Sequence, residues 1–258
     1  MEIRDWATHI ISADRIDDKL FDPKEFTDHC PGEAVFWKEP VRPSGMVLQK
    51  KNKKEKLPAF HEHGDPDKRA VCLHRFAGHE LLAVEIMAYT LLAFPEAPRH
   101  FRRGLANTLR DEQRHVALYI KQMEALGLKF GDLPLYRHFW VHSKYITSPI
   151  KYVSTMSLTL EMANLDFAPM YGKSFLRYGD QESSDLMHTI LEDEISHVNF
   201  GLQWLRKFKP EGTSDWDAWT NSMSELMTPK RAKGFLVHED HRLSAGVPQN
   251  WIDNLKKA

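Results

Sequence analysis

The chain has few cysteines: among its 258 residues only Cys30 and Cys72 occur, far apart in the sequence. Two isolated thiols provide neither a disulfide framework nor a cysteine metal site. Cysteine usage of this kind is typical of a reducing cytoplasm. The opening residues, MEIRDWATHI, carry charges where an export signal needs an apolar run, so the sequence predicts no such signal there.

Long hydrophobic runs and an excess of one charge are also lacking. The most apolar stretch, residues 81–94, is too short to span a membrane and contains Glu85, which favours a buried helix. The formal net charge is -1, so no overall field attracts nucleic acid or an anionic membrane. The composition therefore favours neither a membrane nor a nucleic-acid partner.

Two polar segments near the amino end are interpreted as solvated loops. The run KKNKKEK at residues 50–56 is strongly basic, but a short charge run of this kind usually forms an exposed loop rather than an RNA contact. His61 and His63, in the segment HEHGD, have no partner ligands nearby in the sequence. We expect both imidazoles to be exposed rather than to form a separate metal site.

No alternating strand pattern is present, and apolar residues at helical spacing predict an all-α protein. One domain, residues 1–258, is expected. Residues 1–68 contain six prolines and are predicted to form an irregular extension with one short helix over residues 5–20. The central part, residues 69–208, is interpreted as the helical bundle, and residues 209–258 as an extension of one or two shorter helices.

Four long helices are predicted from the periodic segments and their flanking prolines and glycines, over residues 68–93, 99–126, 149–177 and 181–208. Pro169 is a candidate kink, and Gly127 a candidate C-cap. The loop FPEAP and the turn at Gly179 are short, whereas residues 131–145 form a long aromatic connection. Two helical hairpins joined by a crossover are one wiring of a four-helix bundle.

A repeated octet carries the chemistry. LRDEQRHV at residues 109–116 and LEDEISHV at residues 191–198 agree at Leu, Asp, Glu, His and Val. Residues three apart lie on one face of a helix, so Glu112 with His115 can ligate one ion, and Glu194 with His197 another. A single Glu-x-x-His on a helix is a weak signal, but two copies in the middle of two predicted helices are stronger.

Each copy has a glutamate on the preceding helix. Glu80 lies 32 residues before Glu112, and Glu161 lies 33 residues before Glu194. Four carboxylates neutralise two divalent cations, whereas the same groups without counter-charge are costly to bury. Carboxylate with imidazole suits iron or manganese, and the lack of thiolate ligands disfavours structural zinc.

The choice of these preceding carboxylates is open. Glu85 and Asp166 form a second pair, five residues beyond Glu80 and Glu161. Five residues rotate a helix by about 140° and advance it by about 7.5 Å, so both pairs do not face one ion. Counting outward from the first loop favours Glu80, but the same count from the second loop favours Asp166. We prefer Glu80 and Glu161, because glutamate reaches and bridges better than aspartate.

Residues outside the ligand set have predicted supporting roles. Glu85 and Asp166 are then expected just behind the ligands. Asp111 and Asp193, each directly before a ligand glutamate, are candidates for orienting the imidazoles. Tyr119, one turn beyond His115, is the candidate catalytic residue, for a substrate channel or for radical transfer.

These segments resemble the ferritin-like di-iron carboxylate superfamily, and most closely the bacterial ferritin-like proteins grouped as DUF455. The residues that carry the resemblance are HRFAGHELLAVEIMAYTLLAFPEAPRHFRRGLANTLRDEQRHVALY, GDLPLYRHFW, LTLEMANLDFAP and LEDEISHVNFG, with a weaker likeness in DWATHI, DDKLFDP and RAKGF. The resemblance implies a four-helix bundle with a dinuclear iron site. The ligands it implies are Glu80, Glu112, His115, Glu161, Glu194 and His197. It does not imply a substrate.

The functional expectation is an O2-activating oxidoreductase with two iron ions, manganese or a mixed pair being the alternative. Its partners would be O2, an unknown small-molecule substrate and an external electron donor, and a homodimer is one expected assembly. The alternative functions are iron binding or storage, or peroxide detoxification, and a metal-free scaffold is a third. Long flanks fit poorly into a closed storage cage, which favours the enzyme.

Overall fold

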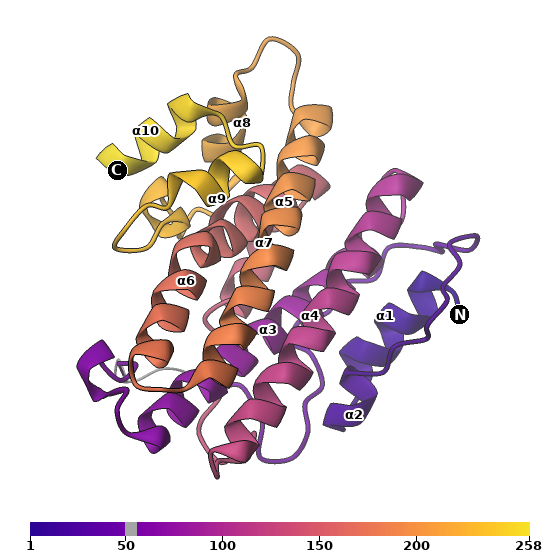
Figure 1. The fold of residues 1–258 in the computed structure, drawn as a ribbon. Coiled ribbons are helices and arrows are strands. Elements are labelled where there is room, and N and C mark those ends of the chain that lie inside the picture. Colours follow the sequence, from indigo (N-terminus) through magenta and orange to yellow (C-terminus); the bar gives the residue numbers. More distant parts are fainter. Residues whose placement is uncertain (50–55) are drawn as a thin grey trace. The chain divides into compact units, whose positions relative to one another are not determined.

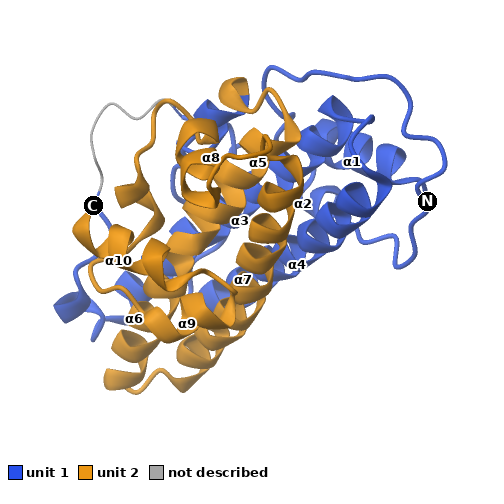
Figure 2. Ribbon diagram, turned by 90° about the horizontal axis from the view of Figure 1, so that it is seen from above, with its two compact units in different colours: residues 1–143 blue, residues 144–258 orange. Residues whose placement is uncertain are grey.

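The computed structural model describes residues 1–49 and 56–258. The basic run predicted as an exposed loop lies outside the described residues except for Lys56, which is exposed. Within the described part of the chain the elements are helices, with two isolated β-bridges and no strand. The prediction of an all-α protein is confirmed. The chain divides into two compact units, residues 1–143 and 144–258 (Figure 2).

The first unit is built on a hairpin of two long helices, α3 (Pro66–Ala93) and α4 (Arg99–Ala125) (Figure 1). The carboxylate of Asp65 accepts from the amide of Asp67 and caps the start of α3. After α4, Gly127 adopts a φ of +88° and its amide donates to the Glu124 carbonyl at 2.9 Å, which confirms the expected C-cap.

Helix α3 is buried along most of its length. By length and composition it is apolar enough to cross a membrane, yet 89% of its most apolar window is buried inside the structure. Helix α4 is amphipathic, although some of its polar residues, among them Glu112 and His115, are buried. A helix that is apolar all round, packed beside an amphipathic one, is the arrangement expected of a core helix and its cover.

The amino-terminal flank packs on this hairpin. Two short helices, α1 (Ile3–Ser12) and α2 (Ile16–Lys19), replace the single helix predicted over residues 5–20. The chain becomes extended at Ala13, which ends α1. The α1 helix lies against α3 and buries the Trp6 indole, whose Nε1 donates to the Phe21 carbonyl at 2.8 Å.

The second unit contains the other hairpin. Its first arm runs through α5 (Pro149–Thr155), the π-helical segment η3 (Met156–Glu161) and α6 (Met162–Arg177). Its second arm is α7 (Gln181–Phe208), which lies beside α6 in Figure 1. The arm is helical over the predicted residues 149–177, but the π-helical segment in its middle was not predicted. The interruption is the π segment, whereas Pro169 lies inside α6.

Tertiary contacts hold the π segment. The Met162 amide donates to the Ser157 carbonyl, five residues back, as a π turn requires. The Thr159 hydroxyl donates to the Ser154 carbonyl at 2.7 Å. From α8 (Asp215–Ser222), the Trp219 indole donates to both of these groups, at 3.1 Å to Thr159 Oγ1 and 3.2 Å to the Ser154 carbonyl.

The carboxyl-terminal flank has more elements than the one or two helices predicted. Besides α8 it contains the 3-10 turn η4 (Pro229–Ala232), α9 (Glu239–Ser244) and α10 (Gln249–Lys257). These elements are short because no long periodic run is present, and aromatic packing joins them. The indoles of Trp219 and Trp251 stack with ring centroids 4.9 Å apart.

Close packing between α7 and η3 depends on a glycine. A Cβ atom added at Gly201 would lie 2.4 Å from the Cβ of Ser157. We expect Gly201→Ala to lower the free energy of unfolding by about 1–3 kcal/mol, because the helices have to separate. Urea unfolding of the single variants and of Gly201→Ala/Ser157→Gly tests this. The double variant should recover part of the loss, and purely additive effects would contradict the proposed clash.

A histidine in the first unit is held neutral. His74 is buried against Phe130, and its Nε2 accepts a hydrogen bond from the Gly131 amide at 3.1 Å. Burial lowers the pKa of His74 to about 4. The pKa of His74 is lower in the folded protein than in the unfolded chain, because the folded state buries the imidazole. The neutral His74 therefore contributes fully to the free energy of unfolding above pH ~6.5, and this contribution is lost as the pH falls toward 4.

We therefore expect His74→Gln to reduce the acid sensitivity of the fold. A glutamine stays neutral and its carbonyl can accept from the same amide. Between pH 7 and pH 4 the wild type should lose on the order of 2–3 kcal/mol more than the variant. Urea unfolding at several pH values measures this difference, and parallel pH dependences would show that His74 does not carry it.

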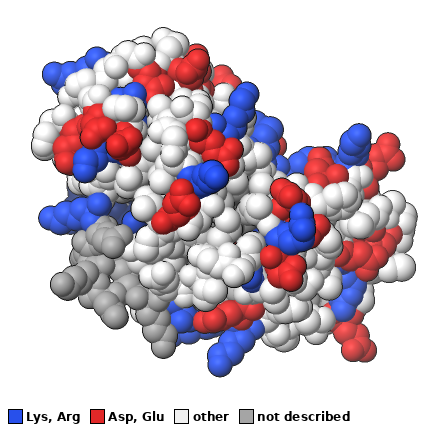
Figure 3. All heavy atoms as spheres, turned by 90° about the horizontal axis from the view of Figure 1, so that it is seen from below, with Lys and Arg blue, Asp and Glu red and all other residues white. Residues whose placement is uncertain are grey.

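The face shown in Figure 3 has Lys and Arg interspersed with Asp and Glu. A mixed surface of this kind concentrates neither anions nor cations over a wide area.

Candidate metal centre

The first unit brings together the three donors predicted on its hairpin. Glu80 extends from α3, and Glu112 and His115 extend from α4. One donor atom from each lies within 4.8 Å of the others, and all three residues are buried. His115 Nδ1 is 3.3 Å from Glu112 Oε2. Two carboxylates this close repel each other unless a cation or a proton lies with them.

The second unit carries the corresponding donors. On α7, His197 Nδ1 lies 3.6 Å from Glu194 Oε2, and both residues are buried. Glu161, also buried, is the last residue of η3, on the arm that packs against α7. The amide of Asn164 donates to Glu194 Oε1 at 2.7 Å. Asn164 was not predicted, although its place three residues after Glu161 puts it on the same helix face.

Glu85, the first alternative ligand, is occupied by cations of the amino-terminal flank. The Lys19 ammonium lies 2.9 Å from Glu85 Oε1, and Arg42 pairs with Oε2. Lys19 also donates to the Ile10 carbonyl at 3.0 Å. Burial lowers the pKa of Lys19, and the nearby Glu85 carboxylate opposes this shift. The carboxylate is therefore neutralised without a metal.

Asp166, the second alternative, is occupied in the same way from the carboxyl-terminal flank. Arg242 contacts both oxygens, with nitrogen–oxygen distances of 2.6 and 2.8 Å. The backbone amides of Gly234 and His238 donate to the same carboxylate at 2.8 and 2.7 Å. This geometry favours Glu80 and Glu161 over Glu85 and Asp166 as ligands, because each of the latter already has its counter-charge.

The other predicted residues lie near the donors. Asp111 is half-buried and pairs with Arg114 at 3.2 Å, and Asp193 is half-buried beside Glu194. Their role in orienting the imidazoles stays a prediction. Tyr119 is buried on α4, with its ring 5.8 Å from that of Phe76. A catalytic role for Tyr119 also stays a prediction.

The expectation for the HEHGD segment is wrong for one of its histidines. His61 is exposed, but the 3-10 turn η1 (Phe60–Glu62) brings His63 into the core, where its Nε2 lies 3.6 Å from the Cys72 sulfur. Burial lowers the pKa of His63 and raises the pKa of Cys72 to about 12. Both groups are therefore neutral at pH 7, and the pair is a core contact rather than a reactive thiolate.

The Asp166–Arg242 pair generates a stability prediction. Asp166→Ala leaves a fully buried guanidinium without its carboxylate, so we expect a loss of about 3–5 kcal/mol in urea unfolding. Asp166→Leu/Arg242→Met should recover part of it, because no charge is left behind, although the amides of Gly234 and His238 lose their acceptor. The matched control is Glu239→Ala, which breaks the exposed Lys256–Glu239 pair of the same flank and should change little. An equal loss in control and test would contradict the assignment.

One family of known proteins matches this chain. The family described as "Protein of unknown function (DUF455)" matches residues 5–253 of this chain. No curated protein and no solved structure is a significant match. The match includes both hairpins, the connection between them and most of the two flanks. The chain therefore belongs to the DUF455 family.

Proposed function

We propose that this protein is a dinuclear iron carboxylate protein that activates O2 to oxidise a small-molecule substrate. The observation that supports it best is the buried cluster of Glu80, Glu112 and His115, with the same donor types repeated on the other hairpin. Manganese or a mixed pair is the alternative metal content, since the donor types suit both ions.

In this proposal the two hairpins form one ferritin-like four-helix bundle. Each hairpin would supply a glutamate from its first arm and a Glu-x-x-His pair from its second, as known bundles with dinuclear carboxylate sites do. The six ligands would be Glu80, Glu112, His115, Glu161, Glu194 and His197. The donor set fits two divalent ions, because four carboxylates balance their charge and no soft sulfur ligand is present.

The bound metals would supply the redox chemistry with O2, using electrons from an external donor. The residues of the chain position and insulate that chemistry. Asn164 donates a hydrogen bond to Glu194 Oε1 and would orient this carboxylate beside His197 for metal binding. Tyr119, buried one turn beyond His115, is our candidate for holding or releasing a proton or an electron.

The flanks favour an enzyme over a store. They cover the hairpins and place cations on Glu85 and Asp166, so these carboxylates do not compete for metal. A storage cage needs free outer helix faces for assembly, whereas α1 already covers part of α3 and α9 contacts α6 and α7.

Metal content tests the site. Protein grown with iron and manganese should contain about two ions per chain by plasma mass spectrometry. Glu112→Ala/His115→Ala should lose them. The matched control is His188→Ala/Glu192→Ala, which removes an exposed imidazole–carboxylate pair from α7, 3.4 Å apart, and should keep both ions.

The folded state of each variant is checked by its thermal unfolding, and Glu112→Gln serves as the milder substitution. A wild type that takes up no metal after anaerobic Fe(II) loading would overturn the proposal. Uptake of iron far beyond two ions per chain would instead identify a store. O2 consumption by the Fe(II)-loaded wild type, absent from Glu112→Gln, would support the oxidase chemistry.

A further inference from the structure

The loop between η4 and α9, residues 233–238, carries exposed apolar side chains. Phe235 is 88% exposed, and Leu236 beside it is 60% exposed. On α6, Phe167 is half-buried, and its ring centroid lies 6.3 Å from that of Phe235. Single exposed apolar residues are ordinary, whereas neighbouring ones that form a patch are typical of an interaction site.

Hydrogen bonds fix both ends of this loop on α6. The amides of Gly234 and His238 donate to the Asp166 carboxylate at 2.8 and 2.7 Å. A Cβ atom added at Gly234 would lie 2.8 Å from the Cβ of Asp166, so the glycine allows this close approach. Arg242 pairs with the same carboxylate and donates to the Ala232 carbonyl, just before the loop, at 3.0 Å.

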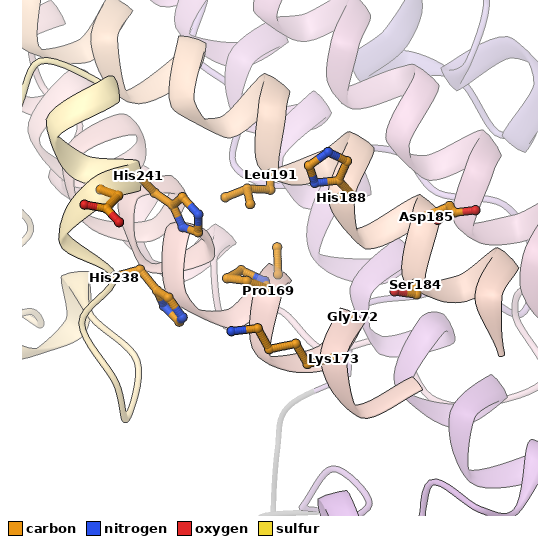
Figure 4. A pocket seen from close by; sticks show the side chains of 11 residues that line it. Pro169, Gly172, Lys173, Ser184, Asp185, His188, Leu191, His238 and His241 are labelled. Atoms are coloured by element: carbon orange, nitrogen blue, oxygen red, sulfur yellow. The ribbon is translucent and has the colours of Figure 1, made fainter. Parts of the chain in front are cut away.

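Imidazoles hold the far end of the loop as well. His241 Nδ1 lies 3.0 Å from the Leu165 carbonyl oxygen, an atom that only accepts, so Nδ1 donates. Figure 4 shows His238 and His241 extending from the α9 segment toward Pro169 on α6. Because the backbone is held on either side of the two exposed apolar side chains, the fold presents them to solvent in a defined position.

The sequence around the loop is basic. Residues 226–238, LMTPKRAKGFLVH, contain Lys230, Arg231 and Lys233 but no carboxylate. Lys230 is exposed, and among the described residues neither Lys230 nor Arg231 has an ion-pair partner. Lys233 donates only to a neutral group, the Lys256 carbonyl, at 3.5 Å. The positive charge of this segment is therefore not neutralised from within.

The Arg231 guanidinium in particular lacks a counter-charge. Arg231 is half-buried, and burial lowers its pKa with no carboxylate to oppose the shift. A cation that is partly removed from water is costly unless an anion lies with it. Of the carboxylates on either side of the segment, Glu239 is paired with Lys256 at 2.5 Å, and Glu225 is exposed. An external anion would supply the missing charge.

We propose that this loop docks on an anionic membrane surface. Phe235 and Leu236 enter the boundary between the headgroups and the acyl chains, and the neighbouring cations contact the lipid phosphates. Large apolar side chains beside basic residues are the two features that bind such a boundary. The local charge differs here from the formal net charge of -1 of the whole chain, which by itself attracts no membrane.

The residue types favour a lipid surface over a protein partner. Lysine is depleted at protein–protein interfaces, whereas two of the three cations of this segment are lysines. Lysine and arginine can also lay their apolar stems beside Phe235 and Leu236 while their charged ends reach the phosphates. Two apolar side chains and three cations form a small anchor, so the contact is reversible. It includes none of the proposed metal ligands and does not depend on the proposed function.

Co-sedimentation with lipid vesicles tests the proposal. Wild type should bind vesicles of phosphatidylglycerol and phosphatidylcholine in equal parts, less tightly as salt rises, and should not bind phosphatidylcholine alone. Phe235→Ser/Leu236→Ser should weaken binding by about tenfold or more, because both apolar side chains are lost. The matched control is Leu176→Ser/Tyr178→Ser, which removes two exposed apolar side chains at the end of α6 and should bind like wild type.

The contribution of charge is tested separately. Lys230→Gln/Lys233→Gln should weaken binding by about tenfold or more, because two cations near the phosphates are lost. Lys121→Gln/Lys129→Gln removes the same charge from exposed positions on and after α4, and should change binding far less. Thermal unfolding shows whether each variant is folded. Equal weakening by the two lysine pairs would show an effect of net charge alone and would overturn the proposed contact.

A fluorescent label at the tip of the loop gives an independent readout. Leu236→Cys in a Cys30→Ser background, labelled with an environment-sensitive dye, should shift its emission to shorter wavelength on the anionic vesicles only. Cys72 is buried and should not react.

Three results would overturn the proposal. The first is equal vesicle binding by wild type and Phe235→Ser/Leu236→Ser. The second is binding to poly-glutamate without binding to vesicles, which would show an acidic protein partner instead. The third is a dimer in analytical ultracentrifugation that Phe235→Ser/Leu236→Ser dissociates, without vesicle binding by the wild type. That result would show an interface between two copies of the chain.

Discussion

The structure depends on the neutralisation of two buried carboxylates, Glu85 on the first hairpin and Asp166 on the second. Each lies five residues beyond a predicted ligand glutamate, and each is paired with a cation from one of the two flanks. Buried ion pairs of this kind contribute little net stability compared with apolar packing, but breaking one is costly. We infer that their main effect is to specify where the flanks attach.

This neutralisation also separates the carboxylates that form ion pairs from those that we propose to bind metal. Without these ion pairs, Glu85 and Asp166 would be additional carboxylates that could compete with Glu80 and Glu161 for a metal ion. On the first hairpin, Glu85 forms ion pairs with Lys19 and Arg42 of the amino-terminal flank. On the second hairpin, Asp166 forms an ion pair with Arg242 of the carboxyl-terminal flank. Glu80, which lies with Glu112 and His115 in one buried cluster, and Glu161 are the carboxylates that we propose as metal ligands. The ion pairs that favour Glu80 and Glu161 as the proposed ligands come from residues far away in the chain.

The long helices and the grouping of Glu80, Glu112 and His115 were predictable from the sequence, because they follow from local periodicity and from prolines and glycines at helix ends. The π segment, the burial of His63 and the partners of Asp166 were not. Each rests on contacts between residues distant in the sequence, such as Asp166 with Arg242, 76 positions apart. Periodicity within one segment carries no information about such pairs.

The π segment links these tertiary contacts to the proposed chemistry. Glu161 is the last residue of this segment. The Trp219 indole of the carboxyl-terminal flank holds the segment by donating hydrogen bonds to the Ser154 carbonyl and to the Thr159 hydroxyl. A π turn is rare inside α-helices and is frequently found at functional sites. Gly201 allows α7 to approach it closely. The flank therefore both neutralises Asp166 and fixes the turn that carries Glu161, so the position of this proposed ligand depends on residues outside the proposed metal site.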